Sequence, residues 1–472
     1  MARHQKLDLI LEGLTIENVA AEGKAITHSE DGQVVFVEFA VPGDIVDVKI
    51  TRKKKAFMEG HIIRIVKPSE RRLEPFCKHF GICGGCRWQP LPYDIQLESK
   101  RRQVYDQLTR IGHLSVPEVL PTIGSARTVF YRNKLEFTAS NKRWILPEED
   151  PEALSDKEKV GLGFHVGKFF DKVLDIEKCH LQSEPSNAIR LFIKDYALKH
   201  DIPFYDIRNN CGVLRNMFVR TTDAGSVMLI VCFGEASEAI FPLLDAVAAA
   251  FPQISSLYYI INSKKNDSVS DQTCILYKGE EAIYEQMEGL RFKIGPKSFY
   301  QTNTLQAYEL YKVARDWAGL SGNELVYDLY TGTGTIAQFV SSRASRVIGI
   351  EYVPEAIEDA KINAEANGIT NCEFFAGDMK DLLTDEFIAA HGKPDVIIVD
   401  PPRAGMHPDV VKTILKTGAR RIVYVSCNPA SQARDLETLC TRYRITGVQP
   451  VDMFPHTQHV ENVCRLELIE QQ

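Results

Sequence analysis

We predict an α/β protein with three parts: an N-terminal OB-like β-barrel, a central β-rich α+β domain and a C-terminal Rossmann-like domain. Strands alternate with helices from about residue 300 onward, which is typical of a doubly wound parallel sheet. The N-terminal segment instead contains several short strands separated by Gly-bearing turns. A chain of 472 residues is also too long for one ordinary domain. We therefore expect domains at 1–66, 67–290 and 291–472.

The N-terminal segment, residues 1–66, has the pattern of a small barrel. Apolar and polar residues alternate over 34–39, and Pro42-Gly43-Asp44 then forms a turn before a second strand at 45–50. Residues 59–66 form a further strand candidate. Barrels of this kind often bind single-stranded nucleic acid, although many do not.

The central segment is irregular and cysteine-bearing at 67–90, and the pattern then predicts a helix from Tyr93 to Ile111. Strands dominate from about 117 to 290, with helices near 184–200 and 237–251. Residues 147–159 are acidic and rich in turn formers, so we expect an exposed loop there.

The C-terminal segment contains six strand candidates, at 324–330, 346–351, 372–375, 395–399, 421–425 and 463–469. Helices are expected between them. In a parallel sheet the carboxyl ends of the strands share one edge, and ligands bind in the crevice outside it. Motifs that follow these strands should therefore converge.

Composition indicates a soluble protein with an uneven charge. Hydrophobic residues make up 44% and charged residues 25%. The first residues lack the apolar stretch of a signal peptide, and no run approaches the roughly 18 apolar residues of a membrane span, so we expect a cytoplasmic protein without a membrane partner. The net charge is −7, but residues 49–110 hold 15 Lys/Arg and 6 Asp/Glu, a balance of +9 that leaves −16 elsewhere. This asymmetry favours a nucleic-acid face, with a solvated basic surface as the alternative.

A glycine motif follows the first of the C-terminal strands. Tyr330, Gly332, Gly334 and Thr335 lie between that strand and a helix, where glycines allow the backbone to approach a ligand. Glu351 ends the next strand candidate and Asp378 follows the one after it, and each could bind a nucleoside: Glu351 the ribose hydroxyls and Asp378 an adenine amino group. A tight turn without a ligand is the alternative. The missing third glycine favours S-adenosylmethionine over a nicotinamide cofactor.

A second motif is Cys77-x5-Cys83-x2-Cys86, for which Cys179 is the candidate fourth ligand. Three thiolates this close suit a soft metal or an iron–sulfur cluster. Four cysteines also satisfy a tetrahedral zinc site, and spacing alone does not separate the two. Cysteines without a ligand are the remaining alternative.

A third group of residues comprises Asp400, Arg403, Cys427 and Glu461. Cys427 follows the strand at 421–425 and precedes Asn428-Pro429, at the expected crevice, where a thiol is a candidate nucleophile. Glu461 lies at the start of the last strand and could act as a general base. The alternatives are a small buried thiol and a solvated carboxylate.

The order of these motifs resembles that of the RNA uracil-C5 methyltransferase family, and most of all the 23S ribosomal RNA (uracil-C5)-methyltransferases of the RlmD type. The resemblance rests on residues 76–86, 298–303, 328–334, 400–403, 426–429 and 459–461. It implies an N-terminal TRAM domain and a [4Fe–4S] cluster on the four cysteines named above. It further implies Cys427 as nucleophile, Glu461 as base and S-adenosyl-L-methionine as methyl donor, with cofactor contacts at Gln301, Tyr330, Glu351, Asp378 and Asp400.

The implied reaction is methyl transfer to C5 of a specific uridine in 23S ribosomal RNA through a covalent bond between Cys427 and C6, by a protein that we expect to be a monomer. Methylation of uracil in transfer RNA is the nearest alternative. Family members that act on transfer RNA often lack the TRAM domain and the cluster, so both features favour ribosomal RNA. Methylation of an exocyclic amine, and a role as an RNA-binding assembly factor, are further alternatives. The sequence departs from the family pattern at Thr331, Thr335 and Ala430-Ser431.

Overall fold

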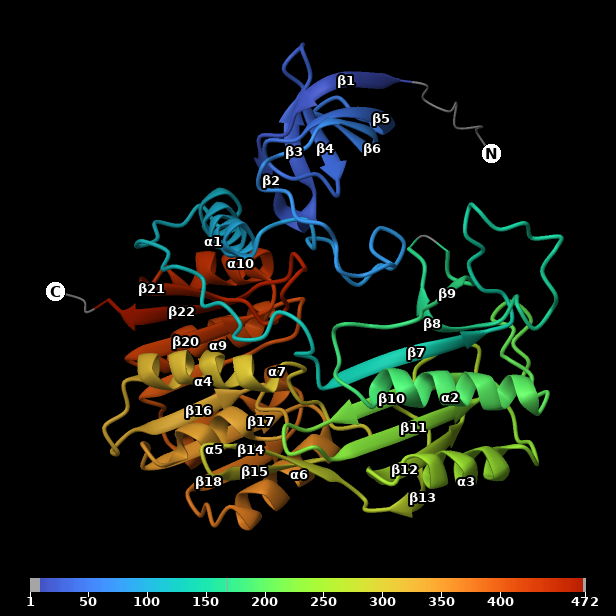
Figure 1. Ribbon diagram of the computed structural model, residues 1–472. Coiled ribbons are helices and arrows are strands. Elements are labelled where there is room, and N and C mark those ends of the chain that lie inside the picture. The colour runs from blue at the N-terminus through green and yellow to red at the C-terminus, as the bar shows by residue number, and fades with distance from the viewer. Residues whose placement is uncertain (1–8, 168, 470–472) are drawn as a thin grey trace.

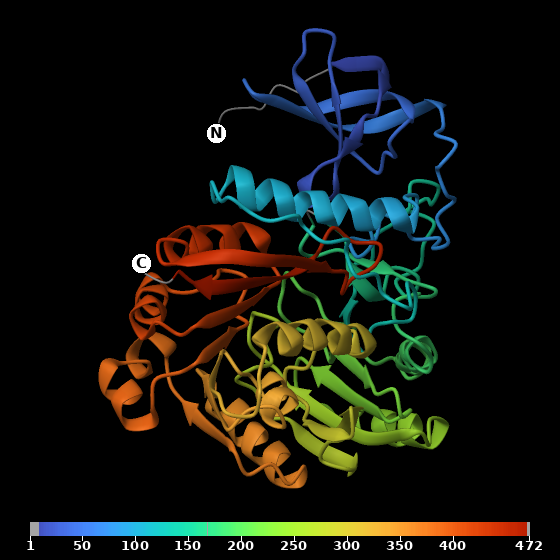
Figure 2. The same ribbon diagram turned by 90° about the vertical axis from the view of Figure 1, so that its left-hand side faces the viewer.

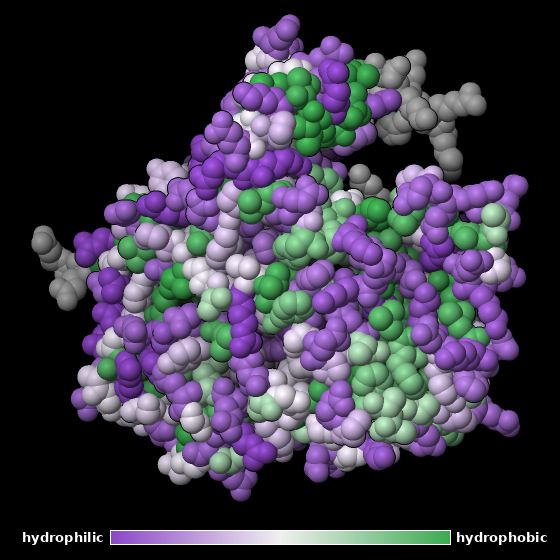
Figure 3. All heavy atoms as spheres, in the orientation of Figure 1, coloured by the Kyte–Doolittle hydropathy of each residue, from purple (hydrophilic) through white to green (hydrophobic). Residues whose placement is uncertain are grey.

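The computed structural model describes residues 9–167 and 169–469 and has three lobes (Figure 1). The N-terminal strands form the upper lobe, the central sheet lies below it on one side, and the C-terminal domain lies on the other. Hydrophilic residues cover most of the face seen in Figure 3. Over the described ranges, no helix combines the length and apolarity needed to span a membrane.

The N-terminal lobe is a six-stranded sheet with the order β1-β5-β6-β4-β3-β2. Alternating residues such as Val35, Val37, Val46 and Val48 are fully buried between its strands, which explains the period-two pattern of the sequence. The strands are β1 (Ile10–Thr15), β2 (Asn18–Val19), β3 (Ala25–His28), β4 (Val34–Glu38), β5 (Ile45–Lys53) and β6 (Phe57–Lys67).

The central lobe is a seven-stranded sheet with the order β13-β12-β11-β10-β7-β8-β9. Its strands are β7 (Lys134–Ser140), β8 (Gly161–His165), β9 (Val173–Asp175), β10 (Leu214–Thr221), β11 (Val227–Phe233), β12 (Ile254–Ile261) and β13 (Ile275–Gly279). Helices α2 (Ser186–Lys199) and α3 (Ile240–Ala250) agree with the two expected helices and cover one face of this sheet. The other face is turned toward the C-terminal lobe (Figure 1).

The C-terminal lobe is a seven-stranded sheet with the order β18-β17-β16-β19-β20-β22-β21. The parallel strands are β16 (Leu325–Leu329), β17 (Arg346–Glu351), β18 (Cys372–Ala376), β19 (Val396–Val399) and β20 (Arg421–Ser426). β22 (Glu461–Leu468) runs antiparallel to β20. The helices are α4 (Thr304–Ala318), α5 (Thr335–Ser341), α6 (Pro354–Ala366), α7 (Met379–Leu382), α8 (Asp385–His391), α9 (Pro408–Thr417) and α10 (Pro429–Leu439). This is the expected α/β arrangement.

One strand of this sheet was not expected from the sequence. β21 (Tyr443–Val451) forms the edge beside β22, so the sheet has seven strands and not six. Arg444 and Gly447 interrupt its apolar pattern, and Pro450 lies near its end. Hydrogen-bonded pairing with β22 stabilises this strand, although its local sequence has a weak strand propensity.

The segment that follows the N-terminal lobe packs on the C-terminal lobe. Helix α1 (Tyr93–Arg110), expected at 93–111, lies along α10 and β21, between the barrel and the C-terminal sheet (Figure 2). Its residues Val104 and Leu108 belong to the C-terminal core. Residues Val119 and Ile123 then bridge to β21 in parallel. The hairpin of β14 (Ile283–Met287) and β15 (Leu290–Ile294) joins the same lobe from the other side. The proposed boundaries at residues 66 and 290 stay predictions.

Candidate active site

A cavity of about 1840 Å³ lies between the carboxyl edge of the C-terminal sheet and the exposed face of the central sheet. Most of the residues singled out in the sequence reach this cavity. Its lining includes Gln301, Tyr330, Gly332, Thr335, Glu351, Asp400, Arg403, Cys427 and Glu461. The topology explains why. Asp400 and Cys427 directly follow parallel strands, whereas Glu461 begins a strand that runs the opposite way and therefore starts at the same edge.

Burial dominates the electrostatics of these groups. The Cys427 thiol has its pKa raised to about 11, first by burial and then by the nearby carboxyls of Glu461 and Asp400. Burial and Asp400 raise the pKa of Glu461 to about 8, and Glu461 is only 4% exposed. Burial, with Asp328 close by, raises the pKa of Asp400 to about 7. In the ligand-free protein, the thiol is therefore protonated at neutral pH.

Arg403 is the cation that opposes these shifts. Its guanidinium lies beside Cys427 and Glu461 and lowers the pKa of both groups. The backbone of its loop is tied to the loop after β20, because the Arg403 carbonyl accepts hydrogen bonds from Asn428 Nδ2 (2.9 Å) and Ser431 Oγ (3.0 Å). The same Asn428 caps α10 through its side chain. These bonds join the loop of Asp400 to the loop of Cys427.

The glycine loop after β16 has the features of a ligand cradle. Glu351 accepts a hydrogen bond from the Gly332 N–H (3.1 Å) and thereby holds the loop at the end of the neighbouring strand. Gly332 has φ +57°, and a Cβ built on it would meet no atom within 4 Å. Since Gly332 lines the cavity, the space that a side chain would fill is open for a ligand. Gly334 differs, because a Cβ there would lie 2.9 Å from Phe374 and Ala360. Its role is therefore close packing.

Two further candidates occupy different positions. The Gln301 backbone carbonyl accepts a hydrogen bond from Asn133 Nδ2 (2.8 Å), which fixes the loop before α4 at the cavity wall. Asp378 does not line the cavity. Its side chain instead caps α7 by accepting from the Lys380 N–H (3.2 Å), and it pairs with the Lys380 ammonium (3.0 Å).

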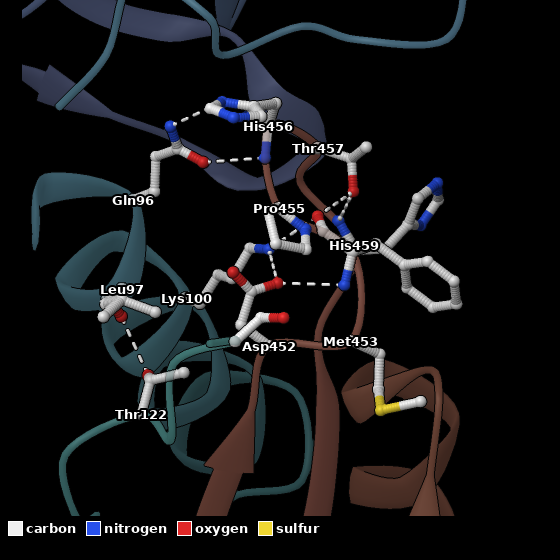
Figure 4. A network of polar contacts seen from close by, with 12 residues as sticks. Gln96, Leu97, Lys100, Thr122, Asp452, Met453, Pro455, His456, Thr457 and His459 are labelled. Atoms are coloured by element: carbon white, nitrogen blue, oxygen red, sulfur yellow. Dashed lines mark hydrogen bonds and ion pairs between the residues drawn. The ribbon is translucent and has the colours of Figure 1, made fainter. Parts of the chain in front are cut away.

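The loop that leads into Glu461 is held by a buried polar network (Figure 4). The Lys100 ammonium, on α1, donates to Asp452 Oδ1 (2.5 Å) and to the Phe454 carbonyl (3.1 Å), and Lys100 and Asp452 are fully buried. Gln96 Oε1 accepts from the His456 N–H (2.9 Å). Helix α1 thus positions the chain immediately before the proposed base.

The four cysteines of the second motif lie near one another, around the loop 77–86. His79 Nε2 accepts from the Glu177 N–H (2.9 Å), and Lys78 pairs with the Glu177 carboxylate (2.6 Å), which places this loop against Cys179. The pKa values of the Cys83 and Cys86 thiols are raised, mainly by burial, to about 11 and about 12. The neighbouring thiols contribute to both shifts. Within 9–167 and 169–469, however, no three His, Cys, Asp or Glu side chains are arranged as a formed metal site.

Some residues of the cavity were missed by sequence reasoning. Tyr311, on α4, is buried beside Asp400, Asp328 and Glu461. Lys134 and Arg220 line the cavity from the central sheet. Lys134 begins β7 and Arg220 lies near the end of β10, and both strands mix polar with apolar residues, so a solvated basic residue is an equally good interpretation of either position.

Comparison with known proteins identifies two parts of the chain. Residues 263–469 match the tRNA (Uracil-5-)-methyltransferase family, and residues 12–63 match the TRAM domain. A protein of Bacteroides thetaiotaomicron described as an uncharacterized RNA methyltransferase is 57% identical over 454 residues, which cover 95% of this chain and 100% of the relative. A protein of Porphyromonas gingivalis with the same description is 57% identical over 464 residues, covering 96% and 99% of the two chains.

A solved structure is similar over nearly the whole chain. The tRNA (uracil-54, C5)-methyltransferase of Pyrococcus abyssi, in complex with S-adenosyl-L-homocysteine, is 28% identical with a TM-score of 0.73. The match covers 97% of this chain and 100% of that protein. A match this complete includes the N-terminal lobe. The presence of that lobe therefore does not distinguish ribosomal from transfer RNA, contrary to the expectation from the sequence.

Proposed function

Because this chain belongs to the S-adenosylmethionine-dependent RNA uracil-5-methyltransferase family, we propose that it methylates C5 of one uridine in 23S ribosomal RNA through a covalent bond between Cys427 and C6. One observation carries the proposal: Cys427, Glu461 and the Gly332 loop line the same cavity. A thiol beside a buried carboxyl and an open cofactor cradle suits nucleophilic catalysis followed by proton removal.

The chemistry requires a covalent step because C5 of uracil is a weak nucleophile. The Cys427 thiolate adds to C6, and the electron pair of the C5–C6 double bond moves toward C5 and the O4 carbonyl. Bound S-adenosylmethionine supplies an electrophilic methyl group. Glu461 then removes the C5 proton, and the re-forming double bond expels the Cys427 thiolate. The net change replaces one C5 hydrogen by methyl, leaves S-adenosylhomocysteine in place of S-adenosylmethionine and releases one proton.

In this mechanism, Arg403 and Glu461 determine where the protons of the thiol and of C5 go. A thiol with a pKa of about 11 must lose its proton before attack, and the adjacent guanidinium is the group that favours the thiolate. The pKa of Glu461, about 8, is close to neutral pH. Such a pKa suits a carboxyl that must be ionised to accept a proton and is neutral afterwards. For S-adenosylmethionine, Gly332 would leave room, and Glu351 lies where it can bind a nucleoside.

The experiment is incubation of unmodified 23S ribosomal RNA with methyl-labelled S-adenosylmethionine, followed by nucleoside mass spectrometry. We expect labelled 5-methyluridine at a defined position. Cys427→Ala should abolish the product yet still bind S-adenosylhomocysteine. RNA that carries 5-fluorouridine at that position should form an adduct stable to denaturing electrophoresis with the wild type only, because C5 then has no proton to lose. Full activity of Cys427→Ala would exclude the covalent mechanism.

Uracil methylation in transfer RNA is the second candidate, and the similarity to the Pyrococcus abyssi enzyme favours it. The same assay with unmodified transfer RNA separates the two substrates. Label in transfer RNA alone would keep the mechanism and replace the substrate.

We further propose that Cys77, Cys83, Cys86 and Cys179 hold a [4Fe–4S] cluster. The partly buried thiols of the loop 77–86 and the docking of this loop against the buried Cys179 support this ligand set. Metal and sulfide analysis of protein purified without oxygen distinguishes four iron and four sulfide per chain from one zinc. Protein that contains neither would refute both metal sites.

A further inference from the structure

The cavity has a second wall that the proposed chemistry does not use, formed by the face of the central sheet opposite α2 and α3. Alternate residues of β7, β10, β11 and β12 point into the cavity from this face. The set consists of Lys134, Glu136, Phe218, Arg220, Ile230, Tyr258 and Ile260. An aromatic and aliphatic surface that carries two cations is the kind of surface that binds a nucleotide.

The two cations lie directly opposite each other. Lys134 on β7 and Arg220 on β10 are register partners in the antiparallel pair, a position in which like charges repel. The Lys134 ammonium lies 5.7 Å from the centre of the Phe218 ring. Glu136 lines the same wall but forms no ion pair with either cation. Glu136 therefore offsets only part of the charge on Lys134, and it does so without a direct ion pair.

Arg220 is the more unusual of the two. It is 5% exposed, its Nε has no hydrogen-bond partner, and within 9–167 and 169–469 no carboxylate pairs with it. Two other buried arginines of this lobe, Arg190 and Arg215, also have an unpartnered Nε, but their terminal guanidinium nitrogens are hydrogen-bonded. Arg190 donates to two backbone carbonyls, and Arg215 donates to three carbonyls and to Asp267. A buried guanidinium without an acceptor costs stability, so an anion that enters the cavity would supply what the fold omits.

We propose that Lys134 and Arg220 form a binding site for a backbone phosphate of the RNA, next to the uridine that enters the active site. The proposal rests on the RNA substrate proposed above. The geometry supports a phosphate, because a guanidinium and an ammonium on adjacent strands can contact one anion together. Phe218 and Tyr258 line the same wall and add apolar surface beside the two cations. Contacts of this kind position the RNA and carry no sequence information.

Burial supports this assignment. It lowers the pKa of Lys134 to about 8, with Arg220 as the next contribution, and lowers the pKa of Arg220 to about 10. A bound phosphate would reverse both shifts. In the ligand-free protein, Lys134 and Arg220 therefore have pKa values far from their ordinary ones, as Cys427 does.

The experiment measures binding of unmodified 23S ribosomal RNA to the full chain over a range of KCl concentrations, with Arg220→Met, Lys134→Met and Arg220→Lys. Each lost phosphate contact should make the slope of log K against log[salt] shallower by about 1 and weaken binding at low salt by roughly tenfold. Arg220→Lys should keep the slope. Lys199→Met, an exposed cation of α2 on the far side of the sheet, is the matched control and should keep both slope and affinity.

Thermal unfolding without RNA provides the second readout. Arg220→Met should melt at or above the temperature of the wild type, because it removes an unpaired buried charge. Lower stability with an unchanged salt slope would assign Arg220 a structural role and overturn the phosphate site. If the wild-type protein methylates the RNA but both Met variants keep the wild-type salt slope, the phosphate site is overturned and the proposed function is not. Wild-type protein that neither binds nor methylates any RNA would overturn the proposed function as well.

Discussion

At the scale of the residue, the site consists of ordinary groups held far from their ordinary protonation states. Glu461, Asp400 and Cys427 are acidic groups that burial and mutual repulsion keep protonated to a higher pH. Arg403 is the cation that lowers the pKa of two of them. The side chain of Arg403 therefore favours the thiolate, against the larger effect of burial.

This leads to a prediction for Arg403→Met. Loss of the guanidinium should raise the pKa of Cys427 above its wild-type value of about 11, so the thiolate population at a given pH falls, by about tenfold for each unit of pKa shift. The rate of Cys427 alkylation by iodoacetamide, followed by peptide mass spectrometry between pH 7 and pH 10, measures this. Arg403→Lys, which keeps the charge, is the control. Equal alkylation rates in wild type and Arg403→Met would show that the guanidinium does not activate the thiol.

At the scale of the element, α1 connects the N-terminal lobe to the loop before Glu461. It packs along α10, and it anchors the loop before Glu461 through Lys100 and Gln96 (Figure 4). The cysteine-bearing segment reaches the same loop, since the Arg87 and Trp88 N–H groups donate to the His456 carbonyl (2.9 and 3.1 Å). The position of Glu461, the base in our proposal, thus depends on segments more than 350 residues earlier in the chain.

Lys100→Met tests this dependence. It leaves the Asp452 carboxylate fully buried without its cation, which should lower stability by about 3–5 kcal/mol and displace the loop. Arg102→Met on the same helix is the matched control. Arg102 is half exposed and, among the described residues, pairs with Asp106 alone, so its loss should cost at most about 1 kcal/mol. Denaturant unfolding monitored by tryptophan fluorescence reports both, because Trp88 lies 5.6 Å from the Lys100 ammonium. Equal losses in the two variants would refute the special role of Lys100.

At the scale of the whole molecule, the two sheets meet across a cavity that neither forms alone. The C-terminal sheet contributes the reactive groups, and the central sheet contributes an aromatic and cationic wall. The cavity therefore contains acidic groups with raised pKa values, such as Glu461 and Asp400, together with Arg220, which has no carboxylate partner among the described residues. Such strain is common at functional sites, where a ligand relieves it.

The pH dependence of stability should reflect this concentration. Glu461, Asp400 and Asp328 have folded pKa values of about 8, 7 and 7, above their ordinary values of 4.5 and 3.8. Folding therefore takes up protons between about pH 4 and pH 8, and the free energy of unfolding falls as the pH rises through that window.

Glu461→Gln should remove part of this fall. As the pH rises from 5 to 8.5, the free energy of unfolding of the variant should therefore increase relative to that of the wild type, by on the order of a few kcal/mol. Melting temperatures across that range provide the measurement. Glu437→Gln, at an exposed position of α10, is the control. Parallel melting curves for wild type and Glu461→Gln at every pH would contradict a raised pKa in the folded protein.

The sequence by itself determined the class of the C-terminal fold and the positions of its reactive groups. Alternating strands and helices specify a parallel sheet, and the chain must then bring the residues after Leu329, Val399 and Ser426 to one edge. These patterns depend on residues close together in the chain, so they can be recognised in a single sequence. The same reasoning accounts for the expected α1, α2 and α3.

The tertiary structure alone decided the rest. It paired β21 with β22, although Arg444 and Gly447 obscure the strand pattern. It turned Asp378 toward a helix cap and not toward the cavity. It also opposed Lys134 to Arg220, which are 86 positions apart in the chain, and left Arg220 without an acceptor. The physical reason is that periodicity encodes which face of a strand is buried, whereas the partner of that face depends on contacts between segments distant in sequence.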